Sequence, residues 1–146
     1  MYEFEHSVDV AATPAQIWAR YTDVATWTEW DEGLEKVTLD GPFTVGSTGA
    51  LTPSGQDALP FTLVQAVENE GFSDETEIPG QVVLRFVHRL VELPEGGTRV
   101  THRLEIEGPA ADEIGPHLGP EISSGFPQTI ATLGAVAAGT ETGPRA

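Results

Sequence analysis

The chain's most constraining feature is a single long β-hairpin predicted between residues 81 and 108. Its arms are Val82–Leu93 and Thr98–Glu107, joined by the turn Pro94-Glu95-Gly96-Gly97. Pairing Glu92 with Thr98 sets the register of every other residue, because side chains alternate between the two faces of a strand. One face then carries the cross-strand pairs Leu90–Val100, His88–His102, Phe86–Leu104 and Leu84–Ile106.

The opposite face of this hairpin is rich in arginine. Its cross-strand pairs are Val91–Arg99, Arg89–Thr101, Val87–Arg103 and Arg85–Glu105. The Arg85–Glu105 pair is mildly favourable for the register, since opposite charges face each other across the strands. The arginine face therefore points to solvent, and two imidazoles, His88 and His102, are expected on the inner face.

The N-terminal part predicts a strand followed by two short helices. Tyr2–Ala11 alternates apolar and polar residues, which is typical of a half-buried strand. Thr13 is a good N-cap, followed by a proline at the first helical position and by Gln16, which completes a capping box. Asp23 is expected to cap a second short helix that carries Trp27 and Trp30.

The remainder predicts more strands and a terminal helix. The expected strands are Glu35–Asp40, Ser47–Pro53, Phe61–Asn69 with Phe61, Leu63 and Val67 on one face, a polar strand Phe72–Ile78, and the two hairpin arms. Asp112–Leu118 predicts one or two helical turns, and Pro120–Ala138 predicts the last helix. Pro127 is expected to kink or restart that helix.

Composition narrows the possible functions. The chain of 146 residues has 7 basic and 23 acidic side chains, a net charge of −16, and no cysteine. We expect no nucleic-acid binding, because it requires a basic surface. We also expect no membrane insertion, because it requires a long apolar run. Disulfides and thiolate metal sites are excluded. We expect a cytoplasmic, single-domain protein over residues 1–139, with a flexible tail at 140–146.

The element order also predicts a cavity. A long antiparallel sheet with one apolar face needs a cover, and the last helix is the longest candidate. Its side chains at Thr129, Ala131, Thr132, Ala135 and Ala138 are short. A curved sheet covered by such a helix is expected to leave a pocket between them.

Several motifs resemble those of a known superfamily. They are Phe4-Glu5-His6-Ser7-Val8 before Thr13-Pro14, Ile17-Trp18, Thr22-Asp23 with Trp27 and Trp30, Pro79-Gly80, Phe86 with His88, and Gly96-Gly97-Thr98-Arg99-Val100-Thr101-His102. Residues 2–139 resemble the START/Bet v 1-like (SRPBCC) superfamily, in its polyketide cyclase/dehydrase and lipid-transport branch. The resemblance implies an α+β helix-grip fold: a curved seven-stranded antiparallel sheet wrapped on a long C-terminal helix, with two short helices after the first strand. It leaves the activity open, because members include carriers, receptors and cyclases.

Three histidines are the main candidates for chemistry. His6, His88 and His102 share the predicted inner face, and in this fold the first strand borders the last. Three neighbouring imidazoles suit zinc, or a general base that removes a proton beside a carbonyl, or polar anchoring inside a mixed cavity. No zinc motif supports the first alternative, so no metal and no cofactor are predicted. His88 and His102 are the catalytic candidates.

The first functional hypothesis is the binding of a small apolar molecule, aromatic or lipid-like, between the sheet and the last helix. An aromatase/cyclase or dehydratase that uses the cavity histidines is the second. A protein-interaction module, possibly a homodimer formed through the outer face with Val83, Val87 and Val91, is the third. The predicted ligand-binding residues are His6, Trp27, Trp30, Phe86, His88, His102, Leu104, Phe126, Ile130 and Leu133.

Overall fold

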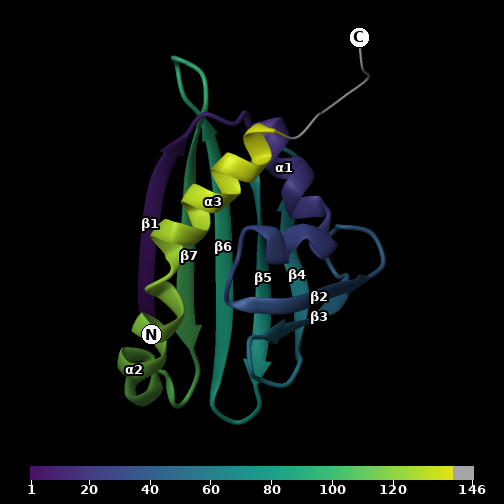
Figure 1. The fold of residues 1–146 in the computed structure, drawn as a ribbon. Helices are drawn as coiled ribbons and strands as arrows, with labels where there is room; N and C mark the ends of the chain where they lie inside the picture. Colours follow the sequence, from purple (N-terminus) through teal and green to yellow (C-terminus); the bar gives the residue numbers. More distant parts are fainter. Residues whose placement is uncertain (140–146) are drawn as a thin grey trace.

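The computed structural model describes residues 1–139, and the predicted tail at 140–146 lies outside them. Seven antiparallel strands form one sheet in the order β1-β7-β6-β5-β4-β3-β2 (Figure 1). The fold is the expected α+β helix-grip fold. The strands are β1 Tyr2–Val10, β2 Leu34–Asp40, β3 Thr48–Pro53, β4 Leu59–Val67, β5 Gly71–Ile78, β6 Val82–Glu92 and β7 Thr98–Glu107.

The predicted register of the β6–β7 hairpin is confirmed, with Glu92 opposite Thr98 and His88 opposite His102. The turn works because Gly96 and Gly97 have φ of 95° and 84°, a left-handed region that glycine enters without strain. β1 continues the same pattern on the far side of β7, where His6 pairs with His102. The fixed turn therefore sets which side chains of three adjacent strands face inward.

Both short helices after β1 are present. Helix α1, Pro14–Thr22, begins with the predicted capping box, in which Thr13 and Gln16 bond reciprocally. The second is a 3₁₀ helix, η1, Val24–Glu29. Asp23 precedes η1 as expected, but its side chain makes no capping hydrogen bond, so that detail of the prediction is wrong.

One strand face was predicted incorrectly in β4. Val67 was expected inward with Phe61 and Leu63, but Val67 is exposed. The register against β5 shifts between Leu63 and Gln65, which marks a bulge. One extra residue reverses the alternation beyond it, so Ala66 faces the core, opposite Phe72.

The C-terminal helix is bent into α2, Ala111–Ser123, and α3, Phe126–Ala138. A helix starting at Pro120 was therefore wrong, whereas the restart near Pro127 is confirmed. The ring of a helical proline clashes with the carbonyl four residues earlier, and for Pro127 that residue is Ser123, where α2 ends. Pro116 and Pro120 lie inside α2 on its exposed side, so neither proline ends the helix there.

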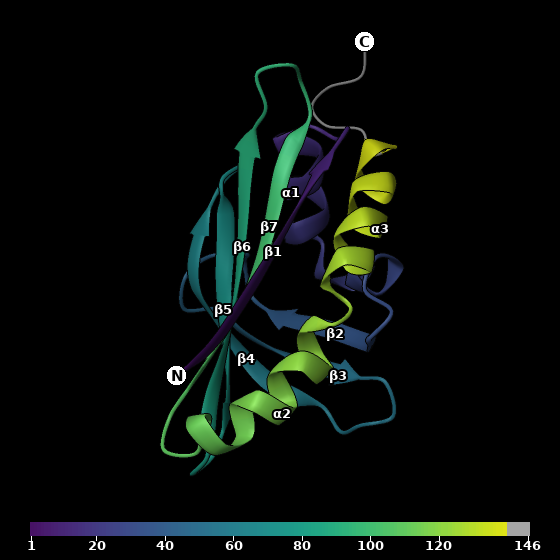
Figure 2. The same cartoon turned by 90° about the vertical axis from the view of Figure 1, so that its left-hand side faces the viewer.

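Helices α2 and α3 lie across the inner face of the sheet, as the side view in Figure 2 shows. Two small residues allow this close approach. A Cβ on Gly119 would lie 2.1 Å from the ring of Tyr2, and one on Gly134 would lie 2.6 Å from Val10. Both strand residues belong to β1, so glycines hold the bent helix against the edge of the sheet.

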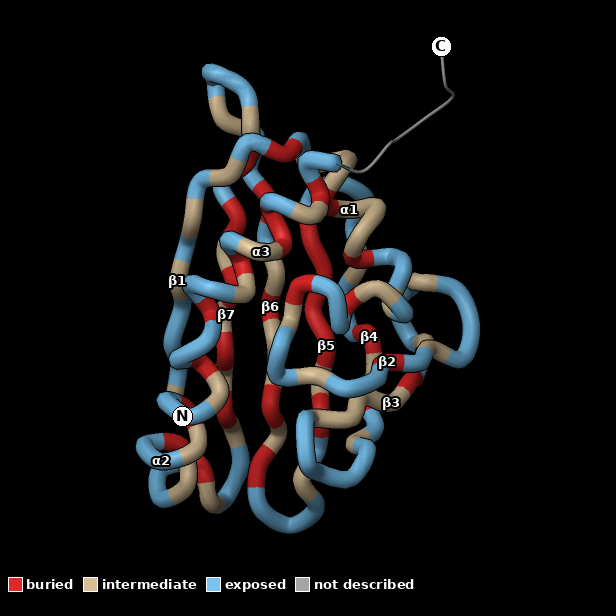
Figure 3. The backbone as a smooth tube through the Cα atoms, in the orientation of Figure 1, coloured by how far each residue is buried: buried red, intermediate tan, exposed pale blue. Residues whose placement is uncertain are grey.

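Buried residues line the side of the sheet that the helices cover (Figure 3). The outer face carries ion pairs instead. Arg85 bonds to Glu75, Glu105 and Glu107, while Arg103 bonds to Glu3, Glu5 and Glu105.

The three outer-face valines differ in exposure. Val87 is buried among its neighbours, whereas Val91 is 59% exposed. Val83 is intermediate. Homodimerisation through this face stays a prediction, which sedimentation can test.

Candidate functional site

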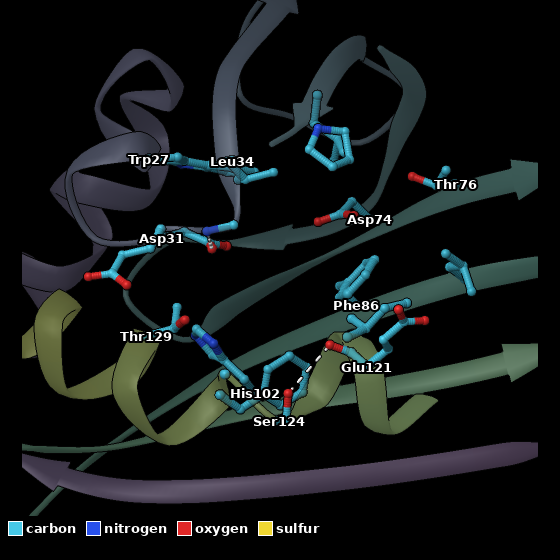
Figure 4. A pocket seen from close by; sticks show the side chains of 18 of the residues that line it. Trp27, Asp31, Leu34, Asp74, Thr76, Phe86, His102, Glu121, Ser124 and Thr129 are labelled. Atoms are coloured by element: carbon cyan, nitrogen blue, oxygen red, sulfur yellow. Dashed lines mark hydrogen bonds between the residues drawn. The ribbon is translucent and has the colours of Figure 1, made fainter. Parts of the chain in front are cut away.

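A cavity of about 570 Å³ lies between the sheet and the bend of the C-terminal helix. Its walls come from β5, β6 and β7, from the segment that joins η1 to β2, and from the α2–α3 junction (Figure 4). This volume is within the range of small-molecule sites. The apolar and aromatic lining side chains are Trp27, Trp30, Leu34, Leu51, Leu59, Ile78, Leu84, Phe86, Leu118, Ile122 and Phe126.

The cavity occupies only part of the space beneath α3. Thr129 and Thr132, two of the short side chains noted in the sequence, line it. On another face of the same helix, Ile130 and Leu133 are fully buried in a packed core instead. Leu104 is buried in a second core cluster beside Phe126. The structure thus places these three predicted ligand-binding residues in the core and not among the cavity-lining residues.

The two facing histidines lie together, as the hairpin register requires. Their ring centroids are 4.7 Å apart. His102 is 4% exposed and bonds through Nε2 to the Tyr21 hydroxyl at 2.9 Å. His88 donates from Nδ1 to the carbonyl of Phe72 at 3.2 Å and stacks on that phenyl ring. A carbonyl only accepts, so Nε2 of His88 is left as an acceptor on a cavity-lining residue.

Burial keeps both imidazoles neutral. It lowers the pKa of His88 to about 4, against which the hydrogen bond to Phe72 acts weakly. It lowers the pKa of His102 well below its usual value, and the neighbouring His88 adds to this. His88 is therefore available as a base, whereas His102 is engaged by Tyr21.

His6, the third predicted member of the group, is separated from the cavity. It pairs with His102 across the strands, but it does not line the cavity. The described residues contain no cluster of three or more His, Asp or Glu side chains arranged to hold a metal. His117 is exposed on α2.

Three polar groups on the cavity wall are buried without a hydrogen-bond partner among the described residues. They are Trp30 Nε1, Asp74 Oδ1 and Thr76 Oγ1, on side chains that are 3%, 2% and 1% exposed. Buried polar groups are nearly always hydrogen-bonded, and an unmade bond costs about 1–3 kcal/mol. Three such groups therefore lie on residues that line one cavity.

Asp74 is a buried cavity residue that sequence reasoning missed. Burial, reinforced by the charge of Glu75, raises the pKa of its carboxyl to about 8. A signal for this position existed in the sequence. Asp74 pairs with Phe86 and Phe72 pairs with His88, so alternation places Asp74 on the inner face with them. We treated Phe72–Ile78 only as a polar strand, without assigning its two faces.

Further acidic groups lie where the cavity opens toward η1 and α2. Asp31, Glu32 and Glu121 are all among the lining residues. Burial raises the pKa of Asp31, although its Oδ1 accepts a hydrogen bond from the backbone of Gly33. The rim of the cavity is therefore acidic.

A curved sheet, a bent covering helix and a cavity between them define a helix-grip protein. The chain belongs to the polyketide cyclase/dehydrase and lipid transport family, whose model matches residues 1–132. This family is associated with the binding of small hydrophobic ligands. A comparison with curated proteins gives no match.

Solved structures share this fold at low sequence identity. Norcoclaurine synthase from Thalictrum flavum, in complex with dopamine and hydroxybenzaldehyde, has a TM-score of 0.74 at 11% identity, covering 97% of this chain and 88% of its own. Protein MLL2253 from Mesorhizobium loti has a TM-score of 0.73 at 18% identity, and the match covers 96% of this chain and 99% of that protein. Ara h 8.0201 has a TM-score of 0.66 at 12% identity, and the match covers 95% of this chain and 99% of that protein. At these identities the likeness shows the fold alone.

Among residues 1–139, no helix is long and apolar enough to cross a membrane.

Proposed function

We propose that this protein binds a small, largely apolar ligand, aromatic or lipid-like, in the cavity between the sheet and the bent C-terminal helix. The observation that carries the proposal is a cavity of about 570 Å³ with apolar walls and three unpartnered polar atoms, on Trp30, Asp74 and Thr76. Apolar walls supply the driving force for binding, and convergent polar groups orient the ligand. Trp27, Trp30, Phe86 and Phe126 provide flat surfaces for an aromatic body.

The test uses a neutral fluorescent hydrophobe, N-phenyl-1-naphthylamine. We expect saturable binding to the wild-type protein, with stronger emission in the apolar cavity. Thr129→Phe places a phenyl ring in the cavity and is expected to weaken binding at least tenfold. Unchanged binding by this variant would show that the dye binds elsewhere.

Ala131→Phe is the matched control for that experiment. Ala131 is exposed on the same helix and does not line the cavity, so the same side chain added there should leave dye affinity unchanged. Thermal unfolding of both variants checks that the fold is retained. Native mass spectrometry of protein purified gently from its host then identifies a retained small molecule.

Polyketide cyclase or dehydratase chemistry is a second candidate function, favoured by the acid–base properties of two cavity groups. Asp74, with a pKa raised to about 8, is mostly protonated near pH 7. His88, with a pKa lowered to about 4, is neutral. Groups whose environments separate their pKa values in this way suit paired acid and base roles. In this scheme Asp74 takes the acid role, because His102 is bonded to Tyr21.

The corresponding reaction is enolisation of a ketone. Nε2 of His88 takes a proton from the carbon beside the carbonyl, and the Asp74 carboxyl gives its proton to the carbonyl oxygen. In deuterium oxide, reversal of this step places deuterium on that carbon. We expect 2-tetralone to exchange faster with wild-type protein than with His88→Gln, while His117→Gln, altered at an exposed histidine, keeps the wild-type rate. Equal rates for wild type and His88→Gln would remove this candidate.

A further inference from the structure

The cavity contains acidic groups and no available cation. Arg103 is the only lysine or arginine among its lining residues, all of which belong to the described part of the chain. Its guanidinium group is bonded to three glutamates, Glu3, Glu5 and Glu105, which extend from β1 and β7. The acidic lining residues, by contrast, are Asp31, Glu32, Asp74 and Glu121.

Asp74 is the deepest of these acidic groups. It lies on the inner face of β5, between Leu63 of β4 and Phe86 of β6. In Figure 4 its carboxyl group extends into the cavity, with Phe86 and Thr76 nearby. Its Oδ1 has no hydrogen-bond partner among the described residues. A buried carboxyl group without a partner is stabilised most by a cation that bonds to it directly.

We propose that the ligand of this cavity is an organic amine, with an aromatic or aliphatic body between the apolar walls and its ammonium group against Asp74. The inference rests on the proposed ligand-binding function and adds the charge and chemical class of the ligand. Thr76 Oγ1 accepts a second ammonium N–H. The aromatic rings of Trp30 and Phe86 favour a nearby cation as well.

The acidic rim distinguishes an amine from other ligands. A carboxylic acid or a fatty acid brings a negative charge toward Asp31, Glu32 and Glu121, which opposes binding. A neutral alcohol bonds to Asp74 but gains nothing from the rim. Only a cation is attracted both by the rim on entry and by the buried carboxyl group at the end of its path.

A pH dependence follows from the groups that face Asp74. Because its carboxyl has a pKa of about 8, binding an ammonium ion below that pH must release its proton. On the neighbouring strands β6 and β7, His88 and His102 are already neutral above pH 6. Glu75 lies behind Asp74 on β5, and the rim contributes Asp31, Glu32 and Glu121.

The experiment compares three probes of the same shape: 2-(2-naphthyl)ethylamine, 2-(2-naphthyl)ethanol and 3-(2-naphthyl)propanoate. Isothermal titration at pH 8.5 is expected to give at least tenfold tighter binding for the amine than for the alcohol, with the acid weakest. Lowering the pH from 7.5 to 6.5 should weaken amine binding about tenfold, since one proton must be released. Alcohol binding should not weaken over that interval.

Asp74→Asn identifies the group responsible. The ratio of amine to alcohol affinity is expected to fall to about one, and the pH dependence of amine binding should disappear. Asp40→Asn removes the same charge at an exposed site on β2 and should keep both properties. Asp31→Asn should reduce the amine preference only in part and keep the pH dependence. The wild-type pH series needs no variant, so the test holds even if a variant unfolds.

Two results separate this inference from the proposed function. If the neutral dye binds and the alcohol binds as tightly as the amine, the amine proposal is overturned while the ligand-binding function stands. The same holds if the amine preference survives Asp74→Asn. If the dye does not bind in the cavity, the proposed function fails, and the amine proposal fails with it.

Discussion

The carboxyl group of Asp74 lies inside the protein without a cation beside it, and its pKa of about 8 has a consequence for stability. In the unfolded chain its pKa returns to the usual 3.8. Between these two values the folded state holds a proton that the unfolded state has lost. The contribution of Asp74 to folding is therefore fully present below pH 4 and is lost as the pH rises to 8.

Asp74→Asn is expected to remove the loss of folding stability that the wild-type protein suffers as the pH rises. An amide keeps nearly the same shape as a protonated carboxyl and does not ionise. Relative to the wild type, the variant should become more stable by up to about 1.4 kcal/mol per pH unit between pH 5 and 8. Urea unfolding at pH 5, 6.5 and 8 measures this difference. A difference that does not change with pH would show that Asp74 is ionised in the folded protein.

The hydroxyl group of Tyr21 also contributes to the stability of the fold. It is fully buried and bonds to Nε2 of His102 at 2.9 Å. Tyr21→Phe leaves that imidazole nitrogen without its partner, at an expected cost of about 1–3 kcal/mol. Tyr2→Phe removes a hydroxyl that makes no hydrogen bond within residues 1–139 and should cost less. Chemical denaturation of both variants tests the pair, and equal losses would contradict the assigned role.

At the scale of elements, the predictions that succeeded depend on local geometry. The turn at Gly96 and Gly97 fixes the hairpin register, which in turn places His88 opposite His102. Alternation along β1 and the capping box at Thr13 are equally local. The failures need more distant information. The bulge in β4 depends on pairing with β5, and the length of α2 depends on Pro116 and Pro120 both facing away from the core.

The contact between α3 and β1 gives a prediction about Gly134. Alanine is preferred to glycine inside a helix by about 1 kcal/mol. Here, however, a Cβ would lie 2.6 Å from Val10, in the packed space between helix and sheet. We expect the clash to dominate, so Gly134→Ala should lower the melting temperature, and a second change, Val10→Ala, should restore part of the loss.

Gly125→Ala is the control for that substitution. Gly125 precedes α3 with φ of −85°, and a Cβ added to it would lie 3.9 Å from Thr129 Oγ1, an ordinary contact distance. The fold should tolerate this alanine. A stabilised Gly134→Ala variant would show that α3 can move away from β1 at little cost.

For the whole molecule, the fold follows from the sequence more completely than the site does. The seven strands, the pairing of the first strand with the last, the covering helix and a cavity beneath it were predicted from periodicity, turns and the family resemblance. The position of the cavity was not. Ile130 and Leu133 pack into the core on one face of α3, whereas Thr129 and Thr132 on another face line the cavity, which also reaches the bend after Ser123. That depends on three-dimensional packing, which periodicity does not describe.

Net charge gives a last prediction at this scale. With 23 acidic and 7 basic side chains, the folded protein concentrates a charge of −16, and mutual repulsion opposes folding. The ion pairs of Arg85 and Arg103 act in the other direction, but they are only partly buried at the sheet surface, where a pair contributes about 0–1 kcal/mol. Because repulsion dominates, raising sodium chloride from 20 to 300 mM should raise the melting temperature. Sucrose at equal osmolality controls for non-ionic effects, and a lower melting temperature in salt would show that the ion pairs outweigh the repulsion.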